Sequence, residues 1–324
     1  MKKRVVAFGE ILWDLLPTGK KLGGAPFNFA YRVNSLGDSG IIASRLGRDA
    51  LGKEACGQVV SLGMDASYIQ WDETAPTGTV EITLDENKNP DYFIVPAVAY
   101  DNTELTEPLL DIARTADCLC FGTLMQRTLP ARKTLESLLD ASKTAVKLLD
   151  INLRKNCYTT ETIARSLEHS NVLKLNDDEA RYLAELFDLP GDSAAFSDAI
   201  VQKFSLDCCV ITFGERGAFA ASAGDEKAYV PGYKVNVIDS CGSGDAFAAG
   251  FIYRYLRGQP LRDCCELGNA MGAMVAAQPG ATIPILKQEI DQFVRANHAR
   301  TSEPSLVGKF TRTDNEPTDS FLTG

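Results

Sequence analysis

Asp239-Ser240-Cys241-Gly242-Ser243-Gly244-Asp245 is the stretch that says most about this chain, and the apolar run 246–252 follows it directly. Glycines let the backbone turn sharply and let a ligand come close, because they carry no Cβ atom. A tight turn ahead of an apolar run predicts a helix that begins at the turn. The first backbone N–H groups of such a helix are unpaired, and the helix dipole adds partial positive charge there. We therefore expect an anion site, most often one for phosphate.

A carboxylate at that helix start suggests a catalytic group. Asp245 would accept the proton of a hydroxyl that attacks a phosphoryl group, while the N–H groups of Gly242, Ser243 and Gly244 hold the transferring phosphate. An ordinary carboxylate with a low pKa suffices, because the proton leaves once the oxygen is already bonding to phosphorus. The alternative for this turn alone is a Gly-rich turn whose carboxylate only satisfies the helix dipole.

A second signature lies more than 200 residues earlier in the chain. It is Leu22-Gly23-Gly24-Ala25-Pro26-Phe27-Asn28-Phe29-Ala30, preceded by Gly9-Glu10-Ile11-Leu12-Trp13-Asp14. The two stretches, in this order, resemble the signatures of the ribokinase-like (PfkB-type) carbohydrate kinases, whose turn reads Asp-Thr-x-Gly-Ala-Gly-Asp. Ser240 replaces the usual Thr and Ser243 the usual Ala, and both keep a backbone N–H and small size. The resemblance covers roughly residues 4 to 297.

Within this family the chain looks most like the bacterial fructokinases. The segments that carry this likeness are Gly23-Gly24-Ala25-Pro26, Phe121-Gly122-Thr123-Leu124-Met125-Gln126-Arg127 and Asp150-Ile151-Asn152-Leu153-Arg154. The resemblance implies an ATP-dependent phosphotransferase with an alcohol group as acceptor. ATP and Mg²⁺ are the implied cofactors, with K⁺ as a further candidate.

Composition restricts the classes of partner. The 324 residues carry a net charge of −10 without a block rich in lysine and arginine, so nucleic acid is not an expected partner. No stretch reaches the roughly 18 apolar residues that a membrane span needs, and no signal peptide is recognisable. Nine cysteines without a CxxC pair indicate reduced thiols in a cytoplasmic protein, and two histidines leave little for a His-rich metal site.

Short apolar runs alternate with helical patterns along most of the chain, which predicts an α/β fold with a mostly parallel sheet. The expected strands cover residues 4–8, 41–44, 118–121, 146–151, 172–175 and 209–212, and the expected helices 105–116, 130–141, 177–187 and 194–204. The resemblance extends this to a three-layer αβα sandwich, ribokinase-like, in one domain over residues 1–310. Residues 311–324 are polar and predict a disordered tail.

One segment departs from this alternation. Residues 79–84 and 92–95 read as two extended strands around a turn cluster at 85–90, which predicts a β-hairpin within about 77–97. The resemblance implies that this hairpin belongs to a small β lid over the sugar site and that the protein is a homodimer. The second strand carries no cation, which favours a neutral hexose over an acidic sugar.

The expected acceptor site uses Asp14, Gly23, Gly24, Asn28 and Arg154. Carboxylate, amide and guanidinium groups can bond sugar hydroxyls or a substrate oxygen, and the two glycines allow backbone approach. Taken singly, Asp14 could sit in a surface turn, Asn28 could cap a helix and Arg154 could form a surface ion pair. The family roles of these positions are what the resemblance implies.

The expected nucleotide side follows later strands. Asn176 and Glu179 match the family's Asn-x-x-Glu motif, linked to phosphate and Mg²⁺ placement, although the same pair reads as a capping box. Residues 212–217 resemble the family's turn along the nucleotide phosphates, and small residues near 269–281 resemble the adenine side; close helix packing is the alternative there. The residues assigned to ATP are Asn176, Thr212, Gly214, Gly217, Asn269 and Gly280, with Glu179 assigned to the metal.

Fructose, giving fructose 6-phosphate, is the expected acceptor. The alternatives are another acceptor (2-keto-3-deoxygluconate, ribose, tagatose or a nucleoside) or a non-catalytic binding protein of the same fold. Retention of Asp245 argues against the non-catalytic alternative, since a protein without catalysis does not need that carboxylate.

Overall fold

The fold is built on a nine-stranded sheet in the order β13-β12-β11-β10-β9-β8-β1-β4-β5, seen in a computed structural model that describes residues 1–16, 19–84 and 90–310. Neighbours from β11 through β5 pair in parallel, and β12 and β13 are antiparallel. The strands are β1 (Arg4–Phe8), β4 (Ser39–Gly47), β5 (Ile69–Asp72), β8 (Cys118–Phe121), β9 (Val146–Asp150), β10 (Val172–Asn176), β11 (Cys208–Thr212), β12 (Ala218–Ser222) and β13 (Lys227–Val230). The mostly parallel α/β sheet is thus confirmed.

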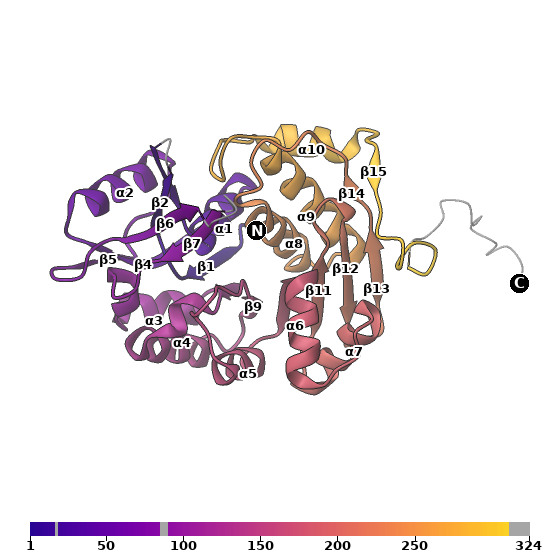
Figure 1. The fold of residues 1–324 in the computed structure, drawn as a ribbon, viewed down its shortest axis with the longest axis horizontal. Helices are drawn as coiled ribbons and strands as arrows, with labels where there is room; N and C mark the ends of the chain where they lie inside the picture. The colour runs from indigo at the N-terminus through magenta and orange to yellow at the C-terminus, as the bar shows by residue number, and fades with distance from the viewer. Residues whose placement is uncertain (17–18, 85–89, 311–324) are drawn as a thin grey trace, which may run out of the picture.

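Helices cover both faces of this sheet (Figure 1). On one face lie α1 (Ala25–Ser35), α2 (Ala50–Ser61), α8 (Ser243–Tyr255), α9 (Leu261–Ala276) and α10 (Lys287–Arg295). On the other lie α3 (Glu107–Arg114), α4 (Leu129–Ala141), α5 (Thr160–Glu168), α6 (Asp177–Phe187) and α7 (Ser193–Phe204). The three-layer sandwich is therefore confirmed.

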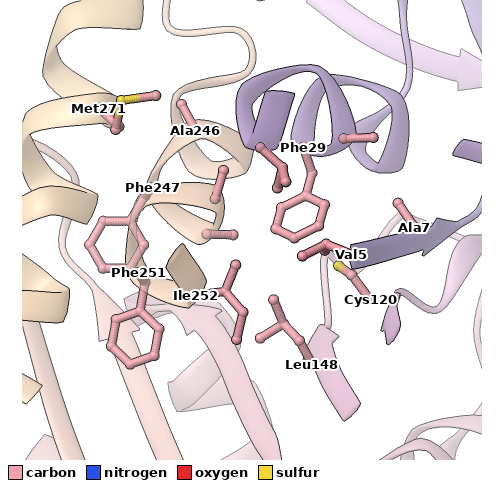
Figure 2. Packing of buried hydrophobic residues seen from close by; sticks show 14 of the residues in the cluster. Val5, Ala7, Phe29, Cys120, Leu148, Ala246, Phe247, Phe251, Ile252 and Met271 are labelled. Carbon is pink, nitrogen blue, oxygen red and sulfur yellow. The ribbon is translucent and has the colours of Figure 1, made fainter. Parts of the chain in front are cut away.

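Each face of the sheet carries its own apolar core because successive side chains of a strand point in opposite directions. In β1, Val5 and Ala7 join the core under α1 and α8, while Val6 and Phe8 join the core under α3 and α4. Figure 2 shows the first of these cores, with Phe247 and Phe251 of α8 on one side and Phe29 of α1 on the other. This packing holds α1 beside α8, although the two helices are far apart in the sequence.

A second, four-stranded sheet lies beside the large one. It has the order β3-β2-β6-β7, with β2 (Leu12–Leu16), β3 (Gly19–Gly23), β6 (Gly78–Leu84) and β7 (Pro90–Ile94). β6 and β7 pair antiparallel, as the predicted hairpin requires, and residues 85–89 of its turn lie outside the described residues. The sequence pattern does not predict β2 and β3. Only residues 12–14 and 22–23 of these strands belong to the signatures.

The last described residues form a separate two-stranded sheet and then pack against the large sheet. β14 (Gly232–Tyr233) pairs with β15 (Arg300–Thr301), and Phe310 packs against Phe219 of β12 with 5.1 Å between ring centroids. The tail predicted at residues 311–324 lies outside the described residues.

Within the part of the chain that is described, no helix combines the length and apolarity needed to cross a membrane. All nine cysteines are free, and seven of them are buried.

Candidate active site

The Gly-rich turn leads into α8 as the sequence predicts. Gly242 is the N-cap residue with φ 77°, a left-handed conformation that favours glycine. Within the described residues, the backbone N–H groups of Gly242, Gly244 and Asp245 have no hydrogen-bond partner, whereas the N–H of Ser243 donates to the carbonyl of Ser240 at 3.2 Å. The open donor set of this turn therefore includes Asp245 and leaves out Ser243.

The loop that contains Gly280 and Ala281 packs against this turn. A Cβ atom on Gly242 would lie 2.4 Å from the Cβ of Ala281, so this position has no room for a side chain. Gly280, which precedes Ala281, has φ 139° and open space around it. The structure thus places the loop of Gly280, assigned from the sequence to the nucleotide, directly against the Gly-rich turn.

Asp245 is held by a residue of the other signature. The Nδ2 of Asn28 donates to its Oδ2 at 2.9 Å, across 217 residues of chain. Burial raises the pKa of Asp245 above its usual range, while the Asn28 hydrogen bond and the charges of Lys174 and Arg154 oppose the rise. The sequence pattern gives no sign of this rise, because desolvation depends on burial in the folded chain.

Lys174 and Asp150 form a buried ion pair beside the turn, and the sequence prediction missed both as site residues. The Nζ of Lys174 lies 2.9 and 3.0 Å from the two carboxylate oxygens of Asp150. A Cβ atom on Gly244 would lie 3.2 Å from the same Nζ, so the ammonium group borders the anion site. A lysine inside the apolar strand 172–175 was the available signal, since a charge buried in a central strand needs a partner.

Glu10 is a further carboxylate that the sequence prediction did not assign. Its Oε1 accepts from the N–H of Ala25 at the start of α1 at 3.0 Å, and burial raises its pKa to about 7. Glu10, Asp150 and Asn152 line a small cavity of about 20 Å³ at the carboxyl ends of β1, β8 and β9. That volume suits about one water molecule between these polar groups.

Residues of the small sheet approach the same place. Asp14 lies in β2, and its Oδ2 would be 2.8 Å from a Cβ atom on Gly23 at the end of β3. Gly24 is the N-cap of α1 with φ 115°, where a Cβ would lie 2.3 Å from the carbonyl of Glu10. Burial raises the pKa of Asp14, and the charges of Arg154 and Lys21 lower it. Gly24 is thus required by close packing against the backbone of Glu10, while Gly23 leaves room for the carboxylate of Asp14.

Arg154 provides the free cation of this cluster. Its side chain is exposed and has no hydrogen bond or ion pair with any residue that the structure describes. Its charge nevertheless lowers the pKa values of Glu10, Asp14 and Asp245, which places the guanidinium near all three carboxyl groups. The structure therefore brings Asp14, Asn28, Arg154 and Asp245 together near the start of α8.

Asn176 and Glu179 form the capping box that was the alternative interpretation. The Oδ1 of Asn176 accepts from the N–H of Glu179, and the Oε2 of Glu179 accepts from the N–H of Asn176, both at 2.8 Å. The Oε1 of Glu179 accepts from the N–H of Leu153 at 2.8 Å. Burial raises the pKa of Glu179, and the charge of Lys174 lowers it, so this carboxylate also belongs to the cluster around the turn.

Two of the remaining predicted nucleotide residues, Gly217 and Asn269, meet at Val230. Thr212 ends β11, and Gly214 begins a short 3₁₀ helix (Gly214–Arg216) with φ 59°. Gly217 follows with φ 97°, and a Cβ there would lie 2.0 Å from the carbonyl of Val230. The Nδ2 of Asn269 donates to the same carbonyl at 3.0 Å. The structure thus brings Gly217 and Asn269 together, and it gives both a packing role at this point.

The chain is similar to known carbohydrate kinases along most of its length. The sequence matches the pfkB family of carbohydrate kinases over residues 8–288. The chain belongs to this family. It is therefore a phosphotransferase with an alcohol group as acceptor. It is 29% identical to fructokinase-2 of Oryza sativa subsp. japonica over 311 residues, which cover 87% of this chain and 90% of the relative.

Solved structures share the fold of this pfkB-family kinase. The fructokinase of Xylella fastidiosa with bound ATP has a TM-score of 0.79 at 20% identity, covering 91% of this chain and 99% of that one. The 2-dehydro-3-deoxygluconokinase of Thermotoga maritima has a TM-score of 0.78 at 19% identity, with the same coverage of 91% and 99%. These likenesses support the ribokinase-like fold and do not discriminate between acceptor sugars.

Proposed function

We propose that this pfkB-family kinase transfers the γ-phosphoryl group of ATP to a hydroxyl of a neutral hexose, and that the hexose is fructose, giving fructose 6-phosphate. The observation that carries the proposal is the contact of Asn28 with Asp245. It joins the proposed sugar-binding signature to a carboxylate at an open helix start. A sugar hydroxyl beside Asn28 would therefore face both the base and the phosphate site.

In the proposed mechanism, Asp245 orients the attacking hydroxyl and takes its proton as the new O–P bond forms and the bond to ADP breaks. The N–H groups of Gly242, Gly244 and Asp245 face the oxygens of the transferring group. Lys174, whose ammonium borders Gly244, neutralises part of the charge on those oxygens. The raised pKa of Asp245 makes its ionised form a stronger base than an ordinary aspartate.

Mg²⁺ would neutralise the nucleotide phosphates, and the residues present suit indirect binding of that ion. Both oxygens of Glu179 already accept backbone N–H groups, yet a carboxylate has about four lone-pair sites, so a metal-bound water can still donate to it. Among the described residues, no group of three or more His, Cys, Asp or Glu side chains could hold a metal by itself. We therefore assign Glu179 to water-mediated contact, and keep K⁺ as a proposed activator, since the Vibrio cholerae fructokinase was solved with fructose, ADP and potassium ion.

The charge around Arg154 favours a neutral acceptor. A carboxylate on the sugar would be attracted to Arg154 and repelled by Glu10 and Asp14, which already share its charge. The hairpin contributes Val80 and Ile94 to the row of Asp14 and so adds no cation there, while Lys21 of β3 on the same row is paired with Asp239. Curated relatives named fructokinase, from Oryza sativa subsp. japonica and Solanum tuberosum, agree with this preference.

An acidic sugar is the second candidate, because Arg154 is unpaired among the described residues. A guanidinium can bind a carboxylate through two hydrogen bonds, and 2-keto-3-deoxygluconate carries one. The likeness to the Thermotoga maritima enzyme keeps this candidate open. Ribose, tagatose and nucleosides remain further acceptors to test.

We further propose that the kinase is a cytoplasmic homodimer joined through the small sheet. One row of this sheet holds Leu15, Glu81 and Phe93 as cross-strand neighbours. Their side chains point to the face opposite to that of Asp14, because successive residues of a strand alternate between faces. Phe93 is 53% exposed and Leu15 is 36% exposed, an apolar pair that a partner subunit would cover. Light scattering of wild type and Phe93→Lys tests this assignment, which requires a dimer that the lysine weakens.

The deciding experiment is an ADP-release assay with Mg-ATP and a panel of acceptors. Fructose, tagatose, ribose, 2-keto-3-deoxygluconate and adenosine are compared in the wild type, Asp14→Ala and Arg154→Ala variants. We expect the highest kcat/KM with fructose, and a higher KM for the sugar in Asp14→Ala without a change in the KM for ATP. Turnover of 2-keto-3-deoxygluconate that depends on Arg154 would replace fructose by the acidic sugar. ATP binding without turnover of any acceptor would favour a non-catalytic protein.

A further inference from the structure

Arg32 of α1 is a buried cation that has no carboxylate partner among the described residues, and its guanidinium carbon lies 5.1 Å from the centroid of the Tyr31 ring. The residue is 0% exposed, and its Nε and Nη1 have no hydrogen-bond partner in the part of the chain that the structure describes. Its Nη2 donates to the backbone carbonyl of Ala281. Burial lowers the pKa of Arg32 to about 10, so the group keeps its proton in neutral solution. A charge buried in this way is costly unless it serves a purpose.

Two other largely buried arginines are paired, which makes Arg32 an exception. Arg127 lies 2.7 Å from a carboxylate oxygen of Asp101, and Arg45 lies 3.0 Å from one of Asp72. Removing Arg127 or Arg45 would leave a buried carboxylate without its cation. Removing Arg32 would leave only a carbonyl without a donor, so ion pairing cannot be the reason for its charge.

The position of Arg32 points to the phosphate site. Asn28 and Arg32 are four residues apart, which places them on the same face of α1. Asn28 reaches Asp245, and Arg32 reaches Ala281, whose side chain packs against Gly242. Ser243 and Gln278, from the helix start and the adjoining loop, also carry buried side-chain oxygens without a partner. Buried polar atoms without a hydrogen-bond partner among the described residues are therefore concentrated behind the turn at Gly242.

We propose that Arg32 is a positioning residue for phosphate binding, which fixes the Gly280–Ala281 loop behind Gly242 and supplies permanent positive charge behind the open N–H groups. The nucleotide phosphate then acts as the missing counter-charge. Because the intervening protein screens poorly, a charge one residue behind the turn still attracts phosphate oxygens. The proposal rests on the phosphoryl-transfer site proposed above and adds to it a residue that does not touch the ligand.

Three variants separate the possible roles of Arg32. Arg32→Met removes the charge and the hydrogen bond, Arg32→Lys keeps the charge, and Arg32→Gln keeps only an amide donor for Ala281. Arg114→Met is the matched control. Arg114 is a half-exposed arginine at the end of α3. It precedes the start of β8 and therefore lies at the amino ends of the strands, away from the turn at Gly242. Binding of ATP (with Mg²⁺) and of adenosine is measured by calorimetry for each protein, together with the melting temperature.

We expect Arg32→Met and Arg32→Gln to weaken ATP binding about tenfold and to leave adenosine binding unchanged, because only ATP carries the phosphates. Arg32→Lys restores most of the ATP affinity. The melting temperature of Arg32→Met stays equal or rises, because a buried unpaired charge has been removed. Should Arg32→Met fail to fold, the contrast between the Lys and Gln variants decides the matter.

Equal loss of ATP and adenosine binding, or a loss with Lys as large as with Gln, would overturn the proposal and leave Arg32 a packing residue. The two proposals fail separately. A protein that phosphorylates no acceptor but shows the Arg32-dependent preference for ATP over adenosine contradicts the kinase function alone. A protein that phosphorylates fructose and shows no such preference contradicts the role of Arg32 alone.

Discussion

The N-termini of α6 and α8 carry a carboxylate at the same position, but the two carboxylates have different hydrogen-bond partners. The helices α6 and α8 each follow a strand or turn and carry a carboxylate at the third helical position, Glu179 and Asp245. In α6 the carboxylate turns back to its own N-cap residue, Asn176, and closes a capping box. In α8 it turns away and bonds Asn28 of another helix, which leaves the N–H groups of the turn open.

The difference identifies the site. A helix start whose donors are satisfied by its own side chains contributes mainly stability, while one with open donors can bind an anion. Gly242 at the N-cap is what keeps α8 open, because glycine has no side chain with which to cap. The following predictions test this comparison between α6 and α8.

The largest expected effect is that of Asp245→Ala. Loss of the proposed base should lower kcat by about a thousandfold, the middle of the range for general-base catalysis, while ATP binding changes little. Steady-state kinetics and calorimetry measure the two quantities. A variant with full activity would exclude Asp245 as the base, whatever its position at the helix start.

Gly242→Ala should come next. The new Cβ would collide with Ala281 in a turn with φ 77°, so we expect ATP affinity to fall by at least about tenfold. Gly63→Ala is the matched control, since Gly63 has φ 73° and nothing within 4 Å of the added Cβ. Both variants should lose about 1 kcal/mol of folding free energy to the strained backbone. Equal ATP affinity in the two variants would contradict the anion site.

Asn28→Ala should change the pH dependence of turnover. The Asn28 hydrogen bond lowers the pKa of Asp245, so its removal raises that pKa further. Because catalysis requires the unprotonated carboxylate, the acid limb of the kcat profile should move to higher pH. At acid pH the activity should fall about tenfold relative to wild type, with a smaller loss at alkaline pH. A profile that only scales down, without moving, would separate Asn28 from the titration of Asp245.

Glu179→Gln should have the smallest effect on turnover. Glutamine can keep the capping box through its amide oxygen, but its NH2 group then faces the N–H of Leu153, so the free energy of unfolding should fall by about 1–3 kcal/mol. At saturating Mg²⁺ we expect kcat within about threefold of wild type, with a higher Mg²⁺ concentration needed for half activity. Denaturant unfolding and a Mg²⁺ titration check these two quantities. A collapse of kcat at saturating Mg²⁺ would mean that Glu179 touches the reacting groups.

Much of the architecture could be predicted from local patterns. The parallel strands at residues 4–8 and 118–121 and the helix over 177–187 match the observed β1, β8 and α6, because apolar periodicity and burial agree in these elements. The strands β2 and β3 could not be predicted this way. Their residues 12–16 and 19–23 contain charges and glycines, and their pairing depends on β6, which lies some 60 residues further along the chain.

The sequence by itself determined the family, the α/β class and the position of the Gly-rich turn that begins α8, because these follow from two signatures in order, from periodicity and from glycine spacing. Only the tertiary structure decided that Asn28 orients Asp245, that Lys174 pairs with Asp150 beside Gly244, and that Arg32 lies unpaired behind Ala281. These contacts join residues far apart along the chain. The pairing of β9 with β10 sets Lys174 beside Asp150, and the packing of α1 against α8 fixes the other distances, which no local pattern encodes.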